Sequence, residues 1–292
     1  MSKIFLEGDL LMKYLAKILS FVLVLVMGFS FSVPVFAADA SAHPIVIDSV
    51  KTQNKQIDYA SIVERLDIDE LDNFIQVEKS SHPEITEKVL EEKLKVKILQ
   101  DGLDKKIICI DNDGNITFNK GVTDGSFFYS YGDLPIIKNK LGNNEKRVFN
   151  KSLVKGLGVL SSAQTAMSYY KTYYNSTSGY EDDNADAFRH ALWMLLAARK
   201  SGASYAREFG VAHENDYPSS SLARSMDLFN NNVGIAKSTK IPGNAPAGDA
   251  EDLALEIIND AVKNGELRRF KGSDIGTKSV LVKTNAVGSR KK

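Results

Sequence analysis

Hydrophobic residues recur at helical spacing through most of the second half of the chain. This pattern predicts helices over residues 145–174, 184–200, 204–215, 222–237 and 251–263. Gly156 and Gly158 are expected to bend or break the first of these helices, because glycine weakens a helix interior. The sequence therefore predicts a helical-bundle-like domain in the C-terminal half.

The first half of the chain has a mixed pattern. Residues 58–66 and 84–99 are predicted to be helical, and residues 45–47 are predicted to form a strand. Two short apolar runs flank Asn112-Asp113-Gly114-Asn115, which is a typical hairpin turn. Cys109 lies in the first of these runs and is expected to be a small buried hydrophobic residue.

The predicted fold class is mainly α: a helical-bundle-like C-terminal domain preceded by a small α+β leader region with a β-hairpin. The predicted boundaries are residues 1–37 for a signal peptide, 38–140 for the leader region, 141–272 for the helical domain and 273–292 for a basic tail.

The N-terminus has the pattern of a secretory signal peptide. Lys13 and Lys17 precede an apolar run over residues 18–36, and small residues suit cleavage after Ala37, with Ala40 as the alternative. An uncleaved membrane anchor is the other interpretation of this run. Met12 is an alternative start for this segment. We therefore expect a secreted, extracellular bacterial protein, either free or associated with the cell wall. No second apolar stretch is long enough to cross a membrane, so no integral membrane segment is expected after cleavage.

The overall charge excludes some partners. Lysine plus arginine residues number 37, as do aspartate plus glutamate residues, which gives no indication of nucleic-acid binding. A single cysteine rules out an intramolecular disulfide and a cysteine-based zinc site. The basic C-terminal end either lies free in solvent or contacts an anionic polymer or lipid of the cell envelope.

The segment from Asn184 to Trp193 concentrates the candidate chemistry. At about 100° per residue, Asp186, Arg189, His190 and Trp193 fall in one narrow sector of a helix. Two further helices contribute polar residues. His213, followed by Glu214, shares a face with apolar and small residues, so we expect it to be buried.

The helix over residues 222–237 carries two apolar stripes. The stripes consist of Leu222, Met226, Phe229 and Val233 on one side and Leu228 and Ile235 on the other. Asp227, Asn230 and Asn231 lie between them, which predicts that these polar side chains face the interior. Asp227 and Asn231 are four residues apart and can act on one ion.

Histidine, carboxylate and amide side chains from adjacent helices are typical of metal sites in helical bundles. The candidate catalytic residues are Asp186, Arg189, His190, His213 and Glu214. The candidate metal ligands are His213, Glu214, Asp227 and Asn231. The hypothesis is a hydrolase that uses a divalent cation on a phosphoester or another ester derived from the cell envelope. In this hypothesis Arg189 holds the small anionic substrate and Asp186 orients His190.

Three alternatives stay open. The cluster is a buried structural network within a non-catalytic envelope or interaction module, or it is a metal-free acid–base site, or the domain is an antibacterial toxin.

Residues from about 143 to 270 resemble a bacterial family of secreted and surface proteins known as a domain of unknown function. The resemblance rests on five ordered motifs: Ala185–Ala191, Trp193, His213-Glu214, Met226–Asn231 and Val233-Gly234. Two positions depart from the family pattern, since Met194 stands where asparagine is usual and Phe229 where histidine is frequent. The resemblance implies a portable, exported helical domain with a variable leader, and it implies no activity.

Overall fold

A computed structural model describes residues 57–111, 114–119, 141–175, 181–271 and 280–290. The predicted signal peptide and the predicted strand over residues 45–47 lie outside the described residues. None of the helices in the described part has the length and hydrophobicity that a membrane span needs.

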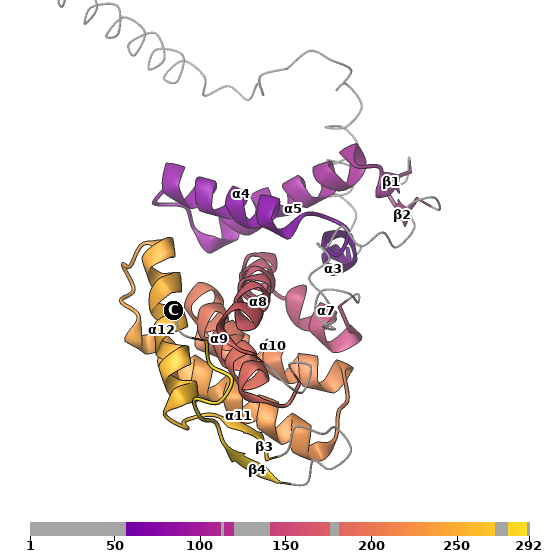
Figure 1. The fold of residues 1–292 in the computed structure, drawn as a ribbon. Helices are drawn as coiled ribbons and strands as arrows, with labels where there is room; N and C mark the ends of the chain where they lie inside the picture. The colour runs from indigo at the N-terminus through magenta and orange to yellow at the C-terminus, as the bar shows by residue number, and fades with distance from the viewer. Residues whose placement is uncertain (1–56, 112–113, 120–140, 176–180, 272–279, 291–292) are drawn as a thin grey trace, which may run out of the picture. The chain divides into compact units, whose positions relative to one another are not determined.

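The described part is mainly helical, as predicted, and it contains a small antiparallel hairpin in its first half (Figure 1). The first elements are α3 (Tyr59–Val63), α4 (Ile68–Ser81), α5 (Glu87–Asp104), β1 (Ile108–Ile110) and β2 (Ile116–Phe118). The helical region follows with α7 (Asn143–Phe149), α8 (Leu153–Tyr173), α9 (Asn184–Ser201), α10 (Ala203–Asp216), α11 (Ser221–Lys237), η1 (Ser238–Lys240) and α12 (Ala247–Lys263). A second hairpin, β3 (Arg268–Phe270) with β4 (Leu281–Lys283), lies near the end.

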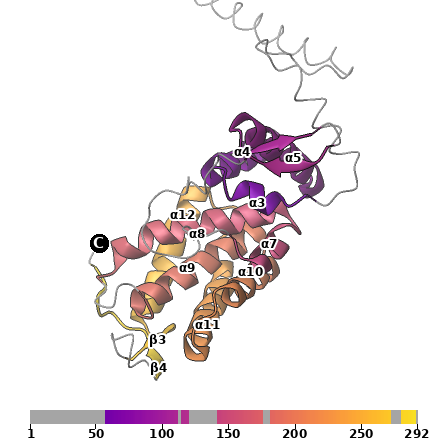
Figure 2. The same cartoon turned by 90° about the vertical axis from the view of Figure 1, so that its right-hand side faces the viewer.

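Helix α9 is the central element of the fold (Figures 1 and 2). It packs most extensively against α8 and α11, and also against α10 and α12. Asp183 begins the helix, because its carboxylate accepts the backbone N–H groups of Ala185 and Asp186. Gly202 ends it with a φ of 89°, a conformation that favours glycine. A helix surrounded in this way buries its polar sector together with its apolar one.

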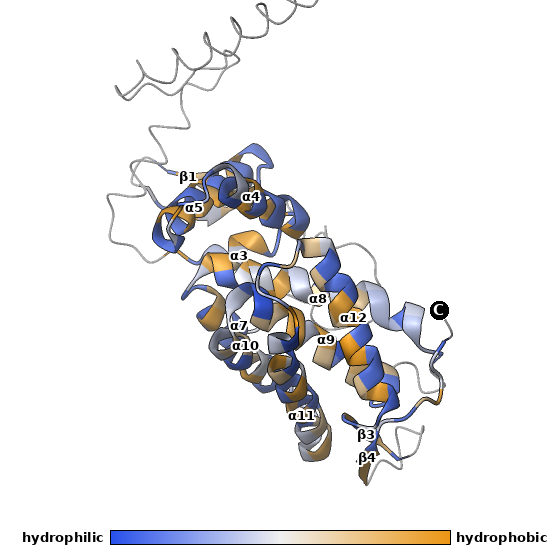
Figure 3. Ribbon diagram, turned by 90° about the vertical axis from the view of Figure 1, so that its left-hand side faces the viewer, coloured by the Kyte–Doolittle hydropathy of each residue, from blue (hydrophilic) through white to orange (hydrophobic). Residues whose placement is uncertain are grey.

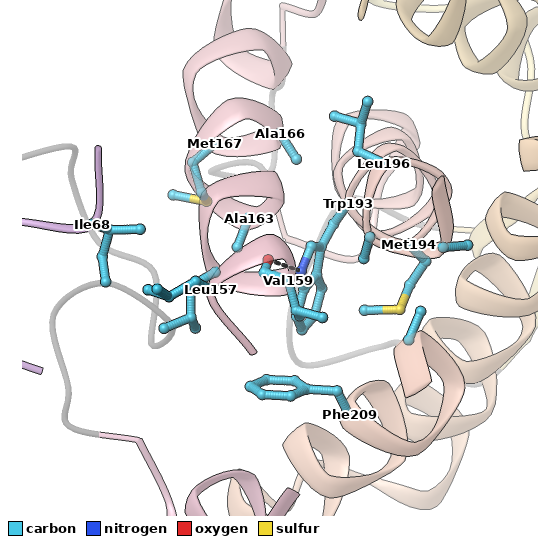
Figure 4. Close-up of a cluster of buried hydrophobic side chains, with 14 of the residues drawn as sticks. Ile68, Leu157, Val159, Ala163, Ala166, Met167, Trp193, Met194, Leu196 and Phe209 are labelled. Atoms are coloured by element: carbon cyan, nitrogen blue, oxygen red, sulfur yellow. Dashed lines mark hydrogen bonds between the residues drawn. The ribbon is translucent and has the colours of Figure 1, made fainter. Parts of the chain in front are cut away.

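The described helices share one hydrophobic core. In Figure 4, Trp193 of α9 lies among Val159 of α8 and Phe209 of α10, and its indole Nε1 donates to the Val159 carbonyl at 3.1 Å. Ile68 of α4 belongs to the same buried cluster. The helices also carry hydrophilic residues beside their hydrophobic ones (Figure 3), as amphipathic elements around a core do. Helix α4 therefore contributes to the same core as α8, α9 and α10.

The prediction of one helix over residues 145–174 was wrong. The chain breaks between α7 and α8, and α8 then continues through Gly156 and Gly158. The break is stabilised by Glu91 of α5, whose carboxylate accepts the N–H groups of Leu153 at 2.5 Å and Val154 at 3.1 Å. Amides at a new helix start need such acceptors, and here the acceptor comes from a distant part of the sequence.

Phe149 gives the reason for one glycine of α8. A Cβ added to Gly156 would lie 2.4 Å from the Phe149 ring, so only glycine lets α7 fold back onto α8. The glycine serves close packing at this place and does not break the helix.

Two other expectations were wrong. Cys109 is exposed, because its position in the two-stranded hairpin alternates with the buried Ile108. The end of the chain is not a free tail over residues 280–290, since β4 pairs with β3 and the side chain of Asn184 bonds to Asn285 and Val287. The segment beyond β4 therefore fixes the start of α9.

The interior position of the polar residues of α11 was predicted correctly. Asp227, Asn230 and Asn231 are buried, whereas Phe229, expected in an apolar stripe, is exposed. Gly234 explains how close this helix comes to α9: a Cβ there would lie 2.1 Å from the carbonyl oxygen of Ala191. This contact between two backbones brings the polar residues of α11 to those of α9.

Candidate functional site

The polar sector of α9 faces the interior and not the solvent. Asp186, Arg189 and His190 are 5%, 7% and 3% exposed. Buried charged groups are costly unless they are paired and hydrogen-bonded, so their partners decide what the site can do.

Asp186 and Arg189 form a tight ion pair within one turn of α9. Arg189 donates to Asp186 Oδ1 through Nη2 and also through Nε at 3.1 Å. The other oxygen, Oδ2, accepts the backbone N–H of Asp182 at 2.7 Å. Burial alone would raise the pKa of Asp186, but the charge of Arg189 and this backbone N–H lower it below its ordinary value. Asp186 is therefore ionised.

His190 is held at both ring nitrogens. Its Nε2 lies 3.0 Å from Arg189 Nη2, and its Nδ1 lies 3.2 Å from Asn231 Oδ1. Guanidinium nitrogens only donate, so Nε2 accepts and Nδ1 carries the proton. Burial and the neighbouring Arg189 lower the pKa of His190 to about 3. The imidazole is therefore neutral.

Two further carboxyl groups approach from α10 and α11. Asp227 Oδ1 lies 3.4 Å from His190 Nε2. Burial, followed by the charges of Asp186 and Glu214, raises the pKa of Asp227 well above its ordinary value. Burial likewise raises the pKa of Glu214. The positive charges near Asp227 and Glu214 are too few to offset the effect of burial on their pKa values.

Three polar atoms in this region have no hydrogen-bond partner among the described residues. They are Asp227 Oδ1, Glu214 Oε1 and Asn231 Nδ2. A buried polar atom without a partner costs about 1–3 kcal/mol, so atoms of this kind often mark the place of a bound group.

One arrangement of ligand atoms is compatible with a metal ion. Asp186, His190 and Asp227 each offer one atom, and these atoms lie within 4.8 Å of one another. Carboxylate oxygens with one imidazole nitrogen suit a divalent cation such as Mn²⁺ or Zn²⁺. Arg189 Nη2 contacts two of these three residues, Asp186 and His190. A cation bound to the three ligand atoms would replace Arg189 as the partner of His190 Nε2.

The structure brings together some of the residues that the sequence singled out. Asp186, Arg189, His190, Asp227 and Asn231 share direct contacts. Glu214 interacts through its charge with Arg189 and Asp186, and its Oε1 has no hydrogen-bond partner among the described residues. His213 has a different partner: its Nδ1 lies 2.9 Å from Glu145 Oε1.

Glu145 was missed as a site residue. It is 1% exposed and lies in the first turn of α7, where its Oε2 accepts the N–H of Gly142 at 2.8 Å. A sequence signal for this residue exists, since a glutamate at the third position of a helix is typical of a capping box. Nothing in the sequence indicates that its other oxygen reaches His213.

The charges of the central cluster do not balance. Asp186, Asp227 and Glu214 are three buried carboxyl groups, and Arg189 is the buried guanidinium next to them. With all three ionised, two negative charges remain uncompensated. A divalent cation would compensate both charges, and without one the carboxyl groups take up protons, as the raised pKa values of Asp227 and Glu214 indicate.

The fold and site thus define a mainly α-helical protein with a buried acidic centre around a neutral histidine. Residues 146–266 match the family described as Domain of unknown function (DUF6973). The matched region contains α8 to α12 and the centre, which confirms the expectation of a domain of unknown function there. No curated protein and no solved structure gives a significant match to the chain.

Proposed function

We propose that the helical domain is a hydrolase of anionic esters, with phosphoesters of the cell envelope as the substrate class, and that it binds one divalent cation at Asp186, His190 and Asp227. The observation that carries the proposal is the convergence of ligand atoms from Asp186, His190 and Asp227. The nearby buried Glu214 supports it, because counting Glu214 with the two aspartates leaves two negative charges beyond the one that Arg189 compensates. When bound, a divalent cation lowers the pKa of its water and so supplies a nucleophile at neutral pH.

The chain's own residues would prepare the site for such a substrate. Asp186 keeps Arg189 oriented, and a cation that replaces the contact between Arg189 and His190 leaves one face of the guanidinium free for an anionic group. Asn231 fixes the imidazole of His190 through Nδ1, which leaves Nε2 as its ligand atom.

Export completes the proposal. The apolar N-terminal run that ends near Ala37 supports secretion from a bacterium, where esters of the cell envelope are within reach.

Metal binding tests the proposal directly. Purified protein titrated with Mn²⁺ and Zn²⁺ should bind one equivalent, raise its melting temperature, and release protons, because Asp227 and Glu214 must ionise. Asp227→Asn should weaken binding by about tenfold or more. Asp260→Asn, the same change on an exposed position of α12, is the matched control and should bind as the wild type does.

Hydrolysis of bis-p-nitrophenyl phosphate is the second readout. It should depend on the added cation and fall by about 100-fold in Asp227→Asn. Negligible metal content and no binding in the wild type would overturn the metal centre, and binding without cleavage of this ester or of p-nitrophenyl acetate would overturn the hydrolase.

A second candidate function is supported by the bonds of Arg189. Arg189 joins Asp186 and His190 on α9, and His190 in turn contacts Asn231 on α11. This network can fix how the two helices cross, in a module that binds a partner and catalyses nothing. Absence of metal binding, together with a large loss of stability in Arg189→Met, would favour this candidate.

A further inference from the structure

We propose that His213 is the proton-transfer residue of the site and that Glu145 is its positioning residue. This inference rests on the proposed function, because it assigns a role in the same hydrolysis. Neither residue belongs to the group of converging ligand atoms.

Glu145 presents a fixed acceptor to the imidazole. One of its carboxylate oxygens lies 2.9 Å from Nδ1 of His213, and the other accepts the Gly142 N–H at 2.8 Å. Its own backbone N–H donates to Asp216 at 2.8 Å, so the start of α7 is fixed on α10. A carboxylate only accepts, and therefore Nδ1 of His213 carries the proton and Nε2 carries the lone pair.

The imidazole of His213 shares an aromatic neighbour with the central cluster. The ring of Trp193 adjoins both histidines, with centroid distances of 5.3 Å to His213 and 6.3 Å to His190. One helical turn before His213, a Cβ added to Gly210 would lie 3.4 Å from Asn231 Nδ2. The face of α10 that carries His213 thus borders the residues of α11 that hold His190.

His190 cannot take the same role. Both of its ring nitrogens already have partners, and its Nε2 belongs to the converging ligand atoms. His213 is engaged by a hydrogen bond at Nδ1, and a base needs its other nitrogen free.

The proton-transfer step balances. Nε2 of His213 takes one proton from the attacking water as the new bond from oxygen to phosphorus, or to carbon, forms. The bond to the leaving oxygen breaks, and this oxygen receives the same proton from the imidazolium. The Glu145 carboxylate, held at Nδ1, stabilises the imidazolium between the two transfers.

Diethyl pyrocarbonate tests the inference without substrate or metal. It reacts with a histidine at a ring nitrogen that carries no proton, so its rate reports which nitrogen of His213 is unprotonated and accessible. The modification rate of each histidine in the intact protein is read by peptide mass spectrometry. His82, which is exposed, is the internal reference, and His190 reports whether the core remains folded. We expect His213 to be modified and His190 to be protected.

Glu145→Gln is the decisive variant. In Glu145→Gln the amide oxygen keeps the Gly142 N–H as its donor, so the NH₂ group faces Nδ1 of His213 and donates to it. The proton of the imidazole then moves to Nε2, and the rate at His213 should fall by about tenfold or more relative to His82. An unmodified His213 in the wild type, or an unchanged rate in Glu145→Gln with His190 still protected, would overturn the inference.

If Glu145→Gln fails to fold, the tautomer of the His213 imidazole in the wild-type protein tests the inference. Long-range ¹H–¹⁵N correlation spectra should show the proton of His213 on Nδ1. A proton on Nε2 would overturn the inference. Neither measurement depends on a bound cation, so a failure here is distinguishable from a failure of the metal centre.

Discussion

His190 and His213 are both buried against the ring of Trp193, and their partners differ in kind. His190 faces a guanidinium, an amide oxygen and a carboxyl group, and its pKa is lowered to about 3. His213 faces one fixed carboxylate. Burial alone therefore does not define what a histidine does: the partners of His190 keep its imidazole neutral, whereas His213 is oriented by a carboxylate.

The two aspartates next to His190 also differ in their partners, and this difference predicts the largest effect on the free energy of unfolding. Asp186→Asn leaves Arg189 buried without its counter-ion and should cost about 3–5 kcal/mol of unfolding free energy. Asp227→Asn removes a carboxyl group whose ionised form is disfavoured, so the metal-free protein should lose nothing or become more stable. Urea denaturation of both variants measures the contrast, and equal losses would show that the two carboxyl groups are equivalent.

The close approach of α11 to α9 predicts the next effect. Gly234→Ala would place a Cβ 2.1 Å from the Ala191 carbonyl and should destabilise the protein by about 2–3 kcal/mol, since two backbones must move apart. It should also lower the affinity for Mn²⁺, because Asp227 moves with α11. Gly248→Ala in α12 is the control: no atom lies within 4 Å of its added Cβ, and stability should be unchanged or slightly raised.

The lowered pKa of His190 predicts a smaller, pH-dependent effect. Below pH 6.5 the unfolded chain takes up a proton at this residue, and the native protein does so only near pH 3. Stability should therefore fall as the pH drops through this window, by up to about 1.4 kcal/mol per pH unit.

His190→Gln should remove this part of the acid-induced loss in denaturation curves at pH 7, 6, 5 and 4. His82→Gln takes away an exposed imidazole and serves as the control. An identical pH dependence in wild type and His190→Gln would mean that the native protein binds the proton as readily as the unfolded chain does.

The sequence predicts the regular part of this fold well. Apolar periodicity locates α9, α10, α11 and α12 to within a few residues, and the Asn112–Asn115 turn indicates the β1–β2 hairpin. Helix α4 was missed although Asp67 caps it, because its many charged residues hide the few buried ones. The break before α8 depends on Glu91, and sequence spacing carries no information on so distant an acceptor.

The sequence singles out the candidate residues, but it predicts only some of the contacts between them. The spacing of Asp186, Arg189 and His190 on one helix implies their proximity, and the structure shows it. The pairing of His213 with Glu145 joins residues 68 positions apart, so no local pattern predicts it. Helix periodicity shows on which face of a helix a residue lies, whereas the partner of that residue depends on how the helices pack.

The carboxylate of Glu91 at the start of α8 has a consequence for modularity. The matched region begins at residue 146, yet the acceptor for the first amides of its longest helix is supplied by α5, outside that region. A version of this domain joined to a different leader must place another acceptor, or open water, at the same position. Replacement of the region that contains α5 by another segment is therefore limited by one hydrogen-bonding requirement at Leu153 and Val154, in addition to the fit of apolar surfaces.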